Sequence, residues 1–276
     1  MPHAVLVTGA TGGIGRAIVK ALSGYTVLAG VRHKSDALNG VRQVVMDVAD
    51  PDSVAAAAKE ITREVGDHGL YAVVNNAGVI VQGPLELVPP GELRRQFEVN
   101  TLGPAYVTQA FLPLLRLGRG RVINISASTA RVPVPLLSAL SGSKAALAAM
   151  SAALRLELAA WNIPVIVVEP GSTATEIFAK AEKNASAVLA LADPERVARY
   201  ARHLAAAAKA QAGLRPAPPE AAAATVLDAL RSAKPRRHYV VPGDARIAGL
   251  LQRLPAGLRE YLLARTLGLT KIGTQA

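Results

Sequence analysis

Short apolar segments alternate with amphipathic segments between residues 4 and 169, and this alternation limits the folds that the chain can adopt. The pattern predicts strands at 4–8, 26–31, 43–46, 71–74, 121–126 and 164–169. It predicts helices between them at 14–22, 52–65, 92–117 and 138–161. This order is typical of an α/β fold in which helices cover both faces of a doubly wound parallel sheet. We expect its ligand to bind beyond the carboxyl ends of the strands.

A different pattern follows Pro170-Gly171. Residues 177–213 are Ala-rich and helical without a partner strand, and 214–219 form a proline-rich break. A helix at 219–230 and a last strand at 237–241 then follow. No internal repeat or second core is visible, so we expect one domain at 1–243. Its segment at about 175–218 is predicted to be a helical substrate lid, with a surface helical hairpin as the alternative.

Residues 244–276 are predicted to form a basic, Leu-rich amphipathic tail. Its helical pattern covers 246–269 and is expected to break at Pro255 and at Gly257. We expect the tail to pack on its own domain or on a second subunit rather than on an anionic membrane surface, because these breaks divide it into short pieces.

The composition excludes several classes of protein. Hydrophobic residues make up 51% of the 276 residues, which excludes disorder for most of the chain. There is no cysteine, no apolar run that could cross a bilayer, and no His/Asp/Glu spacing of a metal site. The net charge of +11 is scattered and only 4% of residues are aromatic, which favours anionic ligands such as nucleotide phosphates over nucleic acid. The N-terminus lacks the basic segment of a signal peptide, so we expect a cytoplasmic protein.

A glycine-rich loop, Thr8 to Gly15, lies directly between the first predicted strand and the first predicted helix. Glycines allow the tight turn that brings backbone N–H groups against a pyrophosphate, and the N-terminus of the helix adds a partial positive charge. Because strand, loop and helix occur together, the sequence predicts dinucleotide binding at this loop.

The spacing of Thr8, Gly9, Gly13 and Gly15 resembles the cofactor loop of the short-chain dehydrogenase/reductase family, whose fold is Rossmann-like. Further elements follow in that family's order at Asp47-Val48, Asn75-Asn76-Ala77-Gly78, Asn100 and Pro170-Gly171 with Thr175. The resemblance covers about residues 4–243 and implies an oxidoreductase that uses a nicotinamide dinucleotide. The cofactor-binding residues that it implies are Gly9, Thr11, Gly13, Ile14, Gly15, Asp47, Val48, Asn76, Ala77, Gly78, Lys144, Pro170, Gly171, Thr173 and Thr175.

The end of the second predicted strand indicates which nicotinamide cofactor binds. NAD-selective folds of this class place a carboxylate there to bind the ribose diol. This chain has Arg32 and Lys34 instead, and its first acid is Asp36. Because a guanidinium pairs well with a 2′-phosphate, we predict NADP(H) in preference to NAD(H), with a solvated basic turn as the alternative.

The predicted active site departs from the family's pattern. The resemblance implies a catalytic Lys144 and a structural and catalytic Asn100. The family's Tyr, four residues before the Lys, protonates the carbonyl oxygen of the substrate, and a Ser thirteen residues earlier polarises it. Leu140 and Ala127 stand at these two positions. A hydrocarbon donates no proton, so the sequence predicts a retained cofactor site with an atypical reaction site.

Other residues offer weak substitutes for these two. Ser126 and Ser128 flank Ala127, but adjacent strand residues face opposite sides, and Ser141 points about a third of a turn away from Leu140. More distant candidates, each expected to be structural, are Glu176, Tyr200, His203, Tyr239, and Tyr261 with Arg265.

Three interpretations of function remain open from the sequence. The first is an NADP(H)-dependent oxidoreductase of altered chemistry, for example an imine or iminium reductase, or an isomerisation or cyclisation in an apolar pocket. The second is an inactive NADP(H)-binding protein or sensor, and the third is a carbonyl reductase that takes a Tyr from elsewhere. An apolar small-molecule substrate is indicated by Phe178, Val188, Leu189 and Leu191, and a homodimer or homotetramer is expected.

Overall fold

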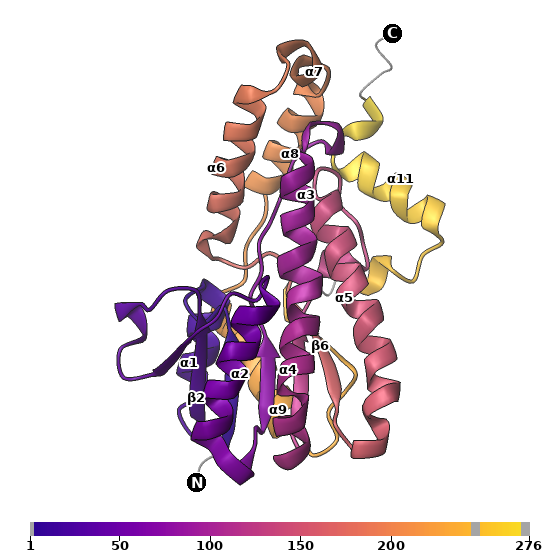
Figure 1. The fold of residues 1–276 in the computed structure, drawn as a ribbon. Coiled ribbons are helices and arrows are strands. Elements are labelled where there is room, and N and C mark those ends of the chain that lie inside the picture. Colours follow the sequence, from indigo (N-terminus) through magenta and orange to yellow (C-terminus); the bar gives the residue numbers. More distant parts are fainter. Residues whose placement is uncertain (1–2, 244–248, 272–276) are drawn as a thin grey trace.

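A sheet of seven parallel strands forms the centre of the molecule in the computed structural model, which describes residues 3–243 and 249–271 (Figure 1). The order along the sheet is β3-β2-β1-β4-β5-β6-β7. The strands are β1 (Ala4–Thr8), β2 (Thr26–Val31), β3 (Arg42–Val45), β4 (Ala72–Asn75), β5 (Arg121–Ile125), β6 (Val165–Glu169) and β7 (His238–Val240). Every neighbouring pair is parallel. The predicted single-domain, doubly wound Rossmann-like fold is confirmed.

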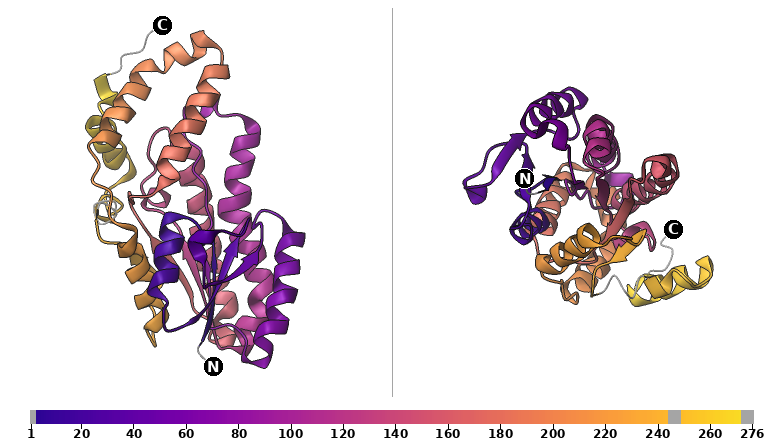
Figure 2. Two further views of the ribbon diagram at one scale, coloured as in Figure 1. Left: turned by 90° about the vertical axis from the view of Figure 1, so that its left-hand side faces the viewer. Right: turned by 90° about the horizontal axis from the view of Figure 1, so that it is seen from below.

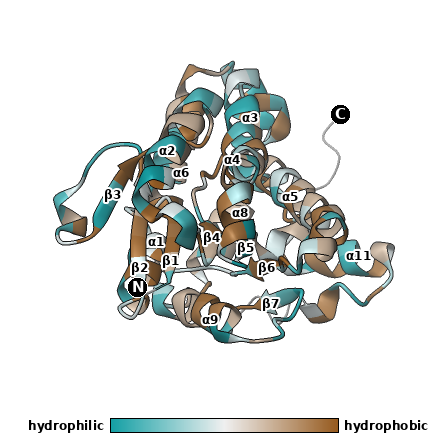
Figure 3. Ribbon diagram, turned by 60° about the horizontal axis from the view of Figure 1, so that its bottom comes forward, coloured by the Kyte–Doolittle hydropathy of each residue, from teal (hydrophilic) through white to brown (hydrophobic). Residues whose placement is uncertain are grey.

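Helices cover both faces of this sheet (Figure 2). One face is packed by α1 (Gly13–Ala21) and α9 (Pro219–Arg231), and the other by α2 (Pro51–Val65), α4 (Gly103–Leu117) and the end of α5 (Ser138–Glu157). Strand β1 shows why the sheet needs both layers. Val5 and Val7 are buried against the first layer and Leu6 against the second, since successive strand side chains point to opposite faces. The central strand β1 and its neighbour β2 are accordingly hydrophobic along most of their length (Figure 3).

The chain changes direction across the sheet between β1 and β4. Strand β1 pairs with β2 on one side and with β4 on the other, so the connections that leave these strands run to opposite sides. A crevice opens beyond the carboxyl ends of the strands at such a switch point, and ligands of doubly wound folds bind there. Thr8 ends β1 and Asn75 ends β4 at this edge.

Most predicted elements match the structure, and the predicted helix at 92–117 is present as a continuous helical segment with one wider turn inside it. The structure has α3 (Pro90–Phe97), a π-helical turn (Glu98–Leu102) and then α4. Pro104 explains the wide turn: it has no N–H to donate to the carbonyl of Asn100 four residues earlier, so the regular ladder is interrupted. Single-turn π segments of this kind occur often at functional sites.

The predicted helix at 138–161 also ends earlier than expected. Helix α5 stops at Glu157 and continues as a 3₁₀ turn, Leu158–Trp161. In the tail, α11 (Ala256–Thr266) begins directly after Pro255 and includes Gly257, so the predicted break at Gly257 is wrong while that at Pro255 is present. A glycine near the start of a helix costs about 1 kcal/mol, which does not break it. Residues 244–248 and 272–276 of the predicted tail lie outside the described residues.

Three helices stand over the carboxyl ends of the strands, and we call them the helical cover: α6 (Glu176–Leu191), α7 (Pro194–Arg199) and α8 (Ala201–Ala212) (Figure 1). Their outer end is joined to the rest of the domain through Glu86. The Arg196 Nε donates to one Glu86 carboxylate oxygen at 3.0 Å, and the Tyr200 hydroxyl donates to the other at 2.8 Å. The hydrogen bond from Tyr200, followed by that from Arg196, lowers the pKa of Glu86.

Two further expectations concern the surface of the protein. None of the helices that the structure describes is long and apolar enough to cross a membrane. Large apolar side chains are exposed on α4 at Leu117 and on α5 at Met150 and Leu156, the last of them 78% exposed. The oligomeric state and the cytoplasmic location stay predictions, as do the limits of the lid and the tail.

Candidate active site

Hydrogen bonds join the glycine-rich loop after β1 to the segment after β4. The Thr8 Oγ1 accepts the backbone N–H groups of Asn76 and Ala77, each at 3.0 Å. The Asn76 Nδ2 in turn donates to the carbonyl oxygens of Thr8 at 3.0 Å and Gly9 at 3.1 Å. Gly9 itself has a φ of 63°, which favours glycine. The two motifs that the sequence separates by about 65 residues therefore form one surface at the switch point.

The N-terminal end of α1, which lies beside this surface, suits an anionic group. A Cβ at Gly15 would overlap the carbonyl oxygen of Gly9 and lie 2.9 Å from the Asn76 Nδ2, so the loop has room for glycine alone. The N-cap residue Gly12 has no side chain that could occupy the N–H groups of the first turn. Those N–H groups and the helix dipole form a site that fits the pyrophosphate of a dinucleotide.

The segment that leads from β6 into the helical cover closes over the same loop. A Cβ at Gly13 would come within 2.8 Å of the Thr175 Cβ. Thr173 pairs with Ala217, and the carbonyl of Pro170 accepts the Ser128 N–H at 3.0 Å, so both ends of the segment are anchored. A hollow of about 570 Å³ lies outside this contact, lined in part by Arg16, Lys20 and Glu220.

Three further residues that are predicted to bind the cofactor, Arg32, Asp47 and Val48, follow strands β2 and β3. The Asp47 Oδ1 accepts the Ala49 N–H at 2.9 Å, which fixes the turn that contains Val48. Val48 packs against Gly103, where a Cβ would lie 3.0 Å from it. Arg32 and Lys34 are exposed after β2, and neither forms an ion pair within the described part of the chain. Both cations are therefore free to meet a phosphate.

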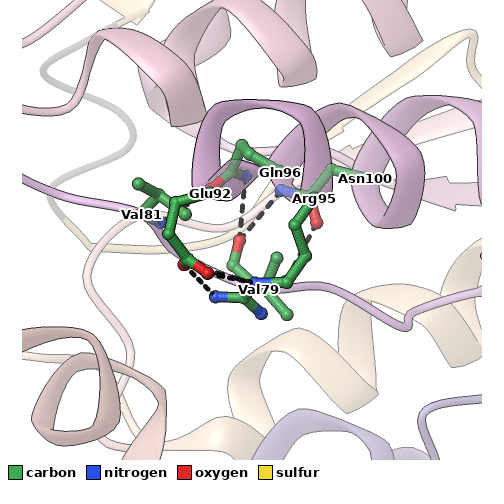
Figure 4. A network of polar contacts seen from close by, with 6 residues as sticks. All are labelled: Val79, Val81, Glu92, Arg95, Gln96 and Asn100. Atoms are coloured by element: carbon green, nitrogen blue, oxygen red, sulfur yellow. Dashed lines mark hydrogen bonds and ion pairs between the residues drawn. The ribbon is translucent and has the colours of Figure 1, made fainter. Parts of the chain in front are cut away.

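Amide side chains of α3 and the π-helical turn hold the strand-like segment after Gly78 (Figure 4). The Asn100 Oδ1 accepts the Val79 N–H at 2.9 Å, and its Nδ2 donates to the Val79 carbonyl at 2.9 Å. The Gln96 Oε1 accepts the Val81 N–H at 2.6 Å, and its Nε2 donates to the same Val79 carbonyl at 2.9 Å. Asn100 is thereby committed to the backbone as a positioning residue. Its predicted catalytic role stays a prediction.

Lys144 is the ionisable group at the centre of the site. Its side chain is only 7% exposed, and its Nζ donates to the carbonyl of Ile125 at the end of β5 at 2.7 Å. The Nζ also faces Gly78, since a Cβ there would lie 3.8 Å from it. Burial alone lowers the pKa of Lys144 to about 8, without a contribution from any charged neighbour.

Leu140 lies one helical turn before Lys144, on the same face of α5. Its side chain is 6% exposed and belongs to an apolar cluster with Ile80 and Ala181, against which Ile177 and Phe178 of α6 also pack. We call this group the Leu140 cluster. It connects the reaction side of the domain to the helical cover, so the hydrocarbon at this position packs against the element that closes the site.

The serines near Ala127 have other partners. Ala127 precedes the 3₁₀ turn Ser128–Ala130. The Ser126 hydroxyl donates to the Lys144 carbonyl at 3.3 Å, and the Ser128 N–H is bonded to Pro170. Two hydroxyls are buried without a hydrogen-bond partner among the described residues, that of Thr129, two residues after Ala127, and that of Ser141, directly after Leu140.

The structure also places the more distant candidates, and each has a structural contact or an exposed position. Tyr239 is buried in the core with its hydroxyl accepting the Arg236 N–H at 3.2 Å, and Tyr200 is bonded to Glu86. Glu176 forms an exposed ion pair with Lys180 at 2.8 Å. Tyr261 is exposed on α11, and the ring of His203 lies 5.6 Å from that of Tyr200.

Two positioning features were missed by the sequence reasoning. Gln96 lies four residues before Asn100, and this helical spacing of two amides is visible in the sequence.

Glu169 at the end of β6 is 2% exposed and is bound by Arg131, whose Nε donates to its carboxylate at 2.8 Å. Arg131 also donates to Gln252 at 3.1 Å, so the described part of the tail contacts its own domain. No sequence pattern pairs Arg131 with Glu169, because only the fold brings them together.

The fold and this site together define a class of protein. A parallel doubly wound sheet with a glycine loop, a helix N-terminus and a buried lysine at its switch point is the arrangement of a nicotinamide-dinucleotide oxidoreductase. Within the described residues, no group of three or more His, Asp or Glu side chains could hold a metal ion.

The model of the short chain dehydrogenase family matches residues 3–186, and the chain belongs to that family of NAD(P)-dependent oxidoreductases. Estradiol 17-beta-dehydrogenase 2 of Rattus norvegicus is 39% identical over 188 residues, which are 63% of this chain and 49% of that protein. This chain thus spans about half the length of that relative.

Two other relatives are similar over most of both chains. An NADPH-dependent 3-dehydrocapnine reductase of Ornithobacterium rhinotracheale is 37% identical over 260 residues, which are 87% of this chain and 88% of that protein. A short chain dehydrogenase of Burkholderia cenocepacia, solved in complex with NADP, is 29% identical with a TM-score of 0.72, covering 96% of this chain and 98% of that chain.

Proposed function

We propose that this protein is an NADP(H)-dependent reductase of substrates with a carbon–nitrogen double bond, imines or iminium ions. The observation that carries the proposal is Leu140. The residue one turn before the buried Lys144 is a hydrocarbon packed in the Leu140 cluster, and Ala127 provides no hydroxyl. A ketone needs a proton at its oxygen as hydride arrives, whereas an iminium carbon is already cationic and needs hydride alone.

The residues that would hold the cofactor fit this proposal. The loop from Gly9 to Gly15 would hold the pyrophosphate, Asp47 and Val48 the adenine end, and Lys144 the nicotinamide side. When bound, a reduced nicotinamide supplies the hydride. The protein contributes alignment of the two reactants, which is worth several kcal/mol, and an apolar wall that excludes water.

We expect Arg32 to select NADP(H). In Arg32→Ala, the Kd for NADPH should rise by about 10- to 100-fold, because a charge-assisted hydrogen bond to a phosphate contributes about 1.5–3 kcal/mol. The Kd for NADH should not change. Calorimetric titration of both nucleotides measures this, with Arg63→Ala on the exposed face of α2 as the control. If the unaltered protein bound NADPH and NADH with equal affinity, the prediction that Arg32 selects NADP(H) would be wrong.

The proposed reaction is tested with a panel of ketones, secondary alcohols and cyclic imines in the presence of NADPH. We expect oxidation of NADPH with cyclic imines and none with ketones. Absorbance at the nicotinamide band follows the reaction, and product analysis identifies the amine. Ketone turnover at the rate of imine turnover would contradict the proposal, because neither Leu140 nor Ala127 offers a hydroxyl that could protonate a ketone oxygen.

One observation favours a second function, an NADP(H)-binding protein without turnover. The cavity between α6 and the segment after Gly78 has a volume of about 20 Å³, with Ile80, Val81 and Val188 in its lining. That volume holds about one water molecule. A substrate could enter between these two elements only if the helical cover moved outward. Binding of NADPH without turnover of any substrate in the panel would favour this second function.

A further inference from the structure

We propose that the Lys144 ammonium is the proton donor of the reaction, so that it converts a neutral imine into the reactive iminium ion within the site. This inference rests on the proposed function and names its substrate more narrowly, as a protonatable imine. It assigns to Lys144 a proton transfer to the substrate, which a residue that only held the cofactor would not perform.

The hydrogen bonds around Lys144 leave part of its ammonium group free to donate protons. An ammonium group has three donors, and only the Ile125 carbonyl, at 2.7 Å, accepts from Nζ within the described residues. Two N–H groups therefore remain for a cofactor hydroxyl and a substrate. They face Gly78, which lacks a side chain, and the adjacent Asn100 Oδ1 is already engaged by the Val79 N–H.

No other acid among the described residues competes with Lys144 for this role. The elements packed against α5 carry charged residues, yet burial is the sole cause of the lowered pKa of Lys144, so none of them shifts it. These residues are Glu92, Arg94 and Arg95 on α3, Glu98 on the π-helical turn, Arg121 on β5, Arg131 after the 3₁₀ turn, Glu169 on β6, Glu176, Lys180, Glu182 and Lys183 on α6, and Arg155 and Glu157 on α5. The remaining neighbours, Ile125, Asn100 and Gly78, do not titrate.

The lowered pKa suits the transfer. At pH 7 a lysine with a pKa of about 8 is still protonated, yet it gives up its proton far more readily than an ordinary ammonium. An imine nitrogen has a basic lone pair and accepts a proton much better than a ketone oxygen does. This difference explains how a site without a phenol reduces imines and spares ketones.

The reaction adds one proton to the nitrogen and one hydride to the carbon of the imine. The imine nitrogen takes a proton from Nζ, which leaves Lys144 as a neutral amine. The carbon of the resulting iminium would then accept a hydride supplied by a reduced nicotinamide cofactor, with the electron pair of the π bond moving to nitrogen. The products are an amine and the oxidised nucleotide, and Lys144 regains its proton from solvent.

Paired substrates test this step. The probes are a cyclic imine and its N-methylated iminium ion, which needs no proton. In K144R, whose guanidinium does not release a proton, and in K144M, which has none, we expect kcat for the neutral imine to fall by about 100-fold. The kcat for the N-methylated ion should fall by at least about 10-fold less than that for the neutral imine at saturating NADPH, because this substrate loses only the contribution of Lys144 to cofactor position. A merely structural role would lower both rates equally.

The unaltered protein provides measurements that need no variant. Its kcat for the neutral imine should fall as pH rises through about 8, because the acid must be protonated, while that for the N-methylated ion stays level. Carbon-13 spectra of lysine-labelled protein should show one side chain titrating near that pH, assigned by its absence in K144R. Calorimetry of NADPH with each variant measures cofactor binding separately.

Two outcomes would overturn the inference. One is equal loss of both rates in K144R and K144M, and the other is a Lys144 resonance that titrates near the ordinary lysine pKa. The proposed function survives either result as long as imines are reduced. It fails separately if NADPH binds and neither probe is turned over, whatever the lysine spectra show.

Discussion

Gly15→Ala should abolish dinucleotide binding, with a Kd for NADPH raised by about 100-fold or more. The added methyl group would overlap the Gly9 carbonyl oxygen and lie 2.9 Å from both the Ala10 Cα and the Asn76 Nδ2. The first turn of α1 must then move away from the loop. Loss of two N–H bonds to a charged phosphate, each contributing about 1.5–3 kcal/mol, accounts for that factor.

Calorimetric titration with NADPH measures this loss, and thermal unfolding measures the accompanying strain, which we expect to cost about 1–3 kcal/mol. Gly24→Ala is the matched control, because that glycine is exposed, has no positive φ, and would place an added Cβ with no other atom within 4 Å. Unchanged affinity in Gly15→Ala would show that the loop does not hold the pyrophosphate.

The sequence was sufficient to predict the parts of the fold that depend on interactions between residues close together in the chain. Strand β1 and strand β2 have the predicted limits, and α2 begins within one residue of its predicted start. Its first turn contains Pro51, and the Asp50 carboxylate caps it by accepting the Asp52 N–H at 3.0 Å. Periodicity reports burial, and capping residues act over a few positions. Both signals are therefore visible in a single sequence.

The parts that were missed depend on contacts between distant segments. The π-helical turn follows from Pro104 together with the bonds of Asn100 to Val79, and Thr101 in the same turn donates to the Ser143 carbonyl at 2.9 Å. The packing of Leu140 against α6 joins residues about 40 positions apart. The sequence could show that Leu140 lacks a hydroxyl, but only the fold shows that it helps to hold the helical cover closed.

A hydroxyl restored at the Leu140 position should create ketone reduction. In the double variant Leu140→Tyr with Ala127→Ser, we expect ketone turnover to rise by about 10²- to 10⁴-fold above the level of the parent protein, the usual contribution of a positioned proton donor. Lys144, one turn away with two free N–H groups among the described residues, would stabilise the phenolate that forms. NADPH oxidation with the ketones of the panel measures the gain.

The matched control is Leu140→Phe with Ala127→Ser, which adds the same ring without its hydroxyl. Both rings are larger than leucine and must push Ile177 and Phe178 of α6 outward, so both variants open the helical cover to a similar extent. Ketone turnover confined to the tyrosine variant therefore isolates proton donation from the change in shape. Equal ketone turnover in the two variants would show that the closed cover, and not the missing phenol, restricts the substrate. The proposed imine reduction would then lose its main support, because that proposal depends on Leu140 having no hydroxyl that could donate a proton.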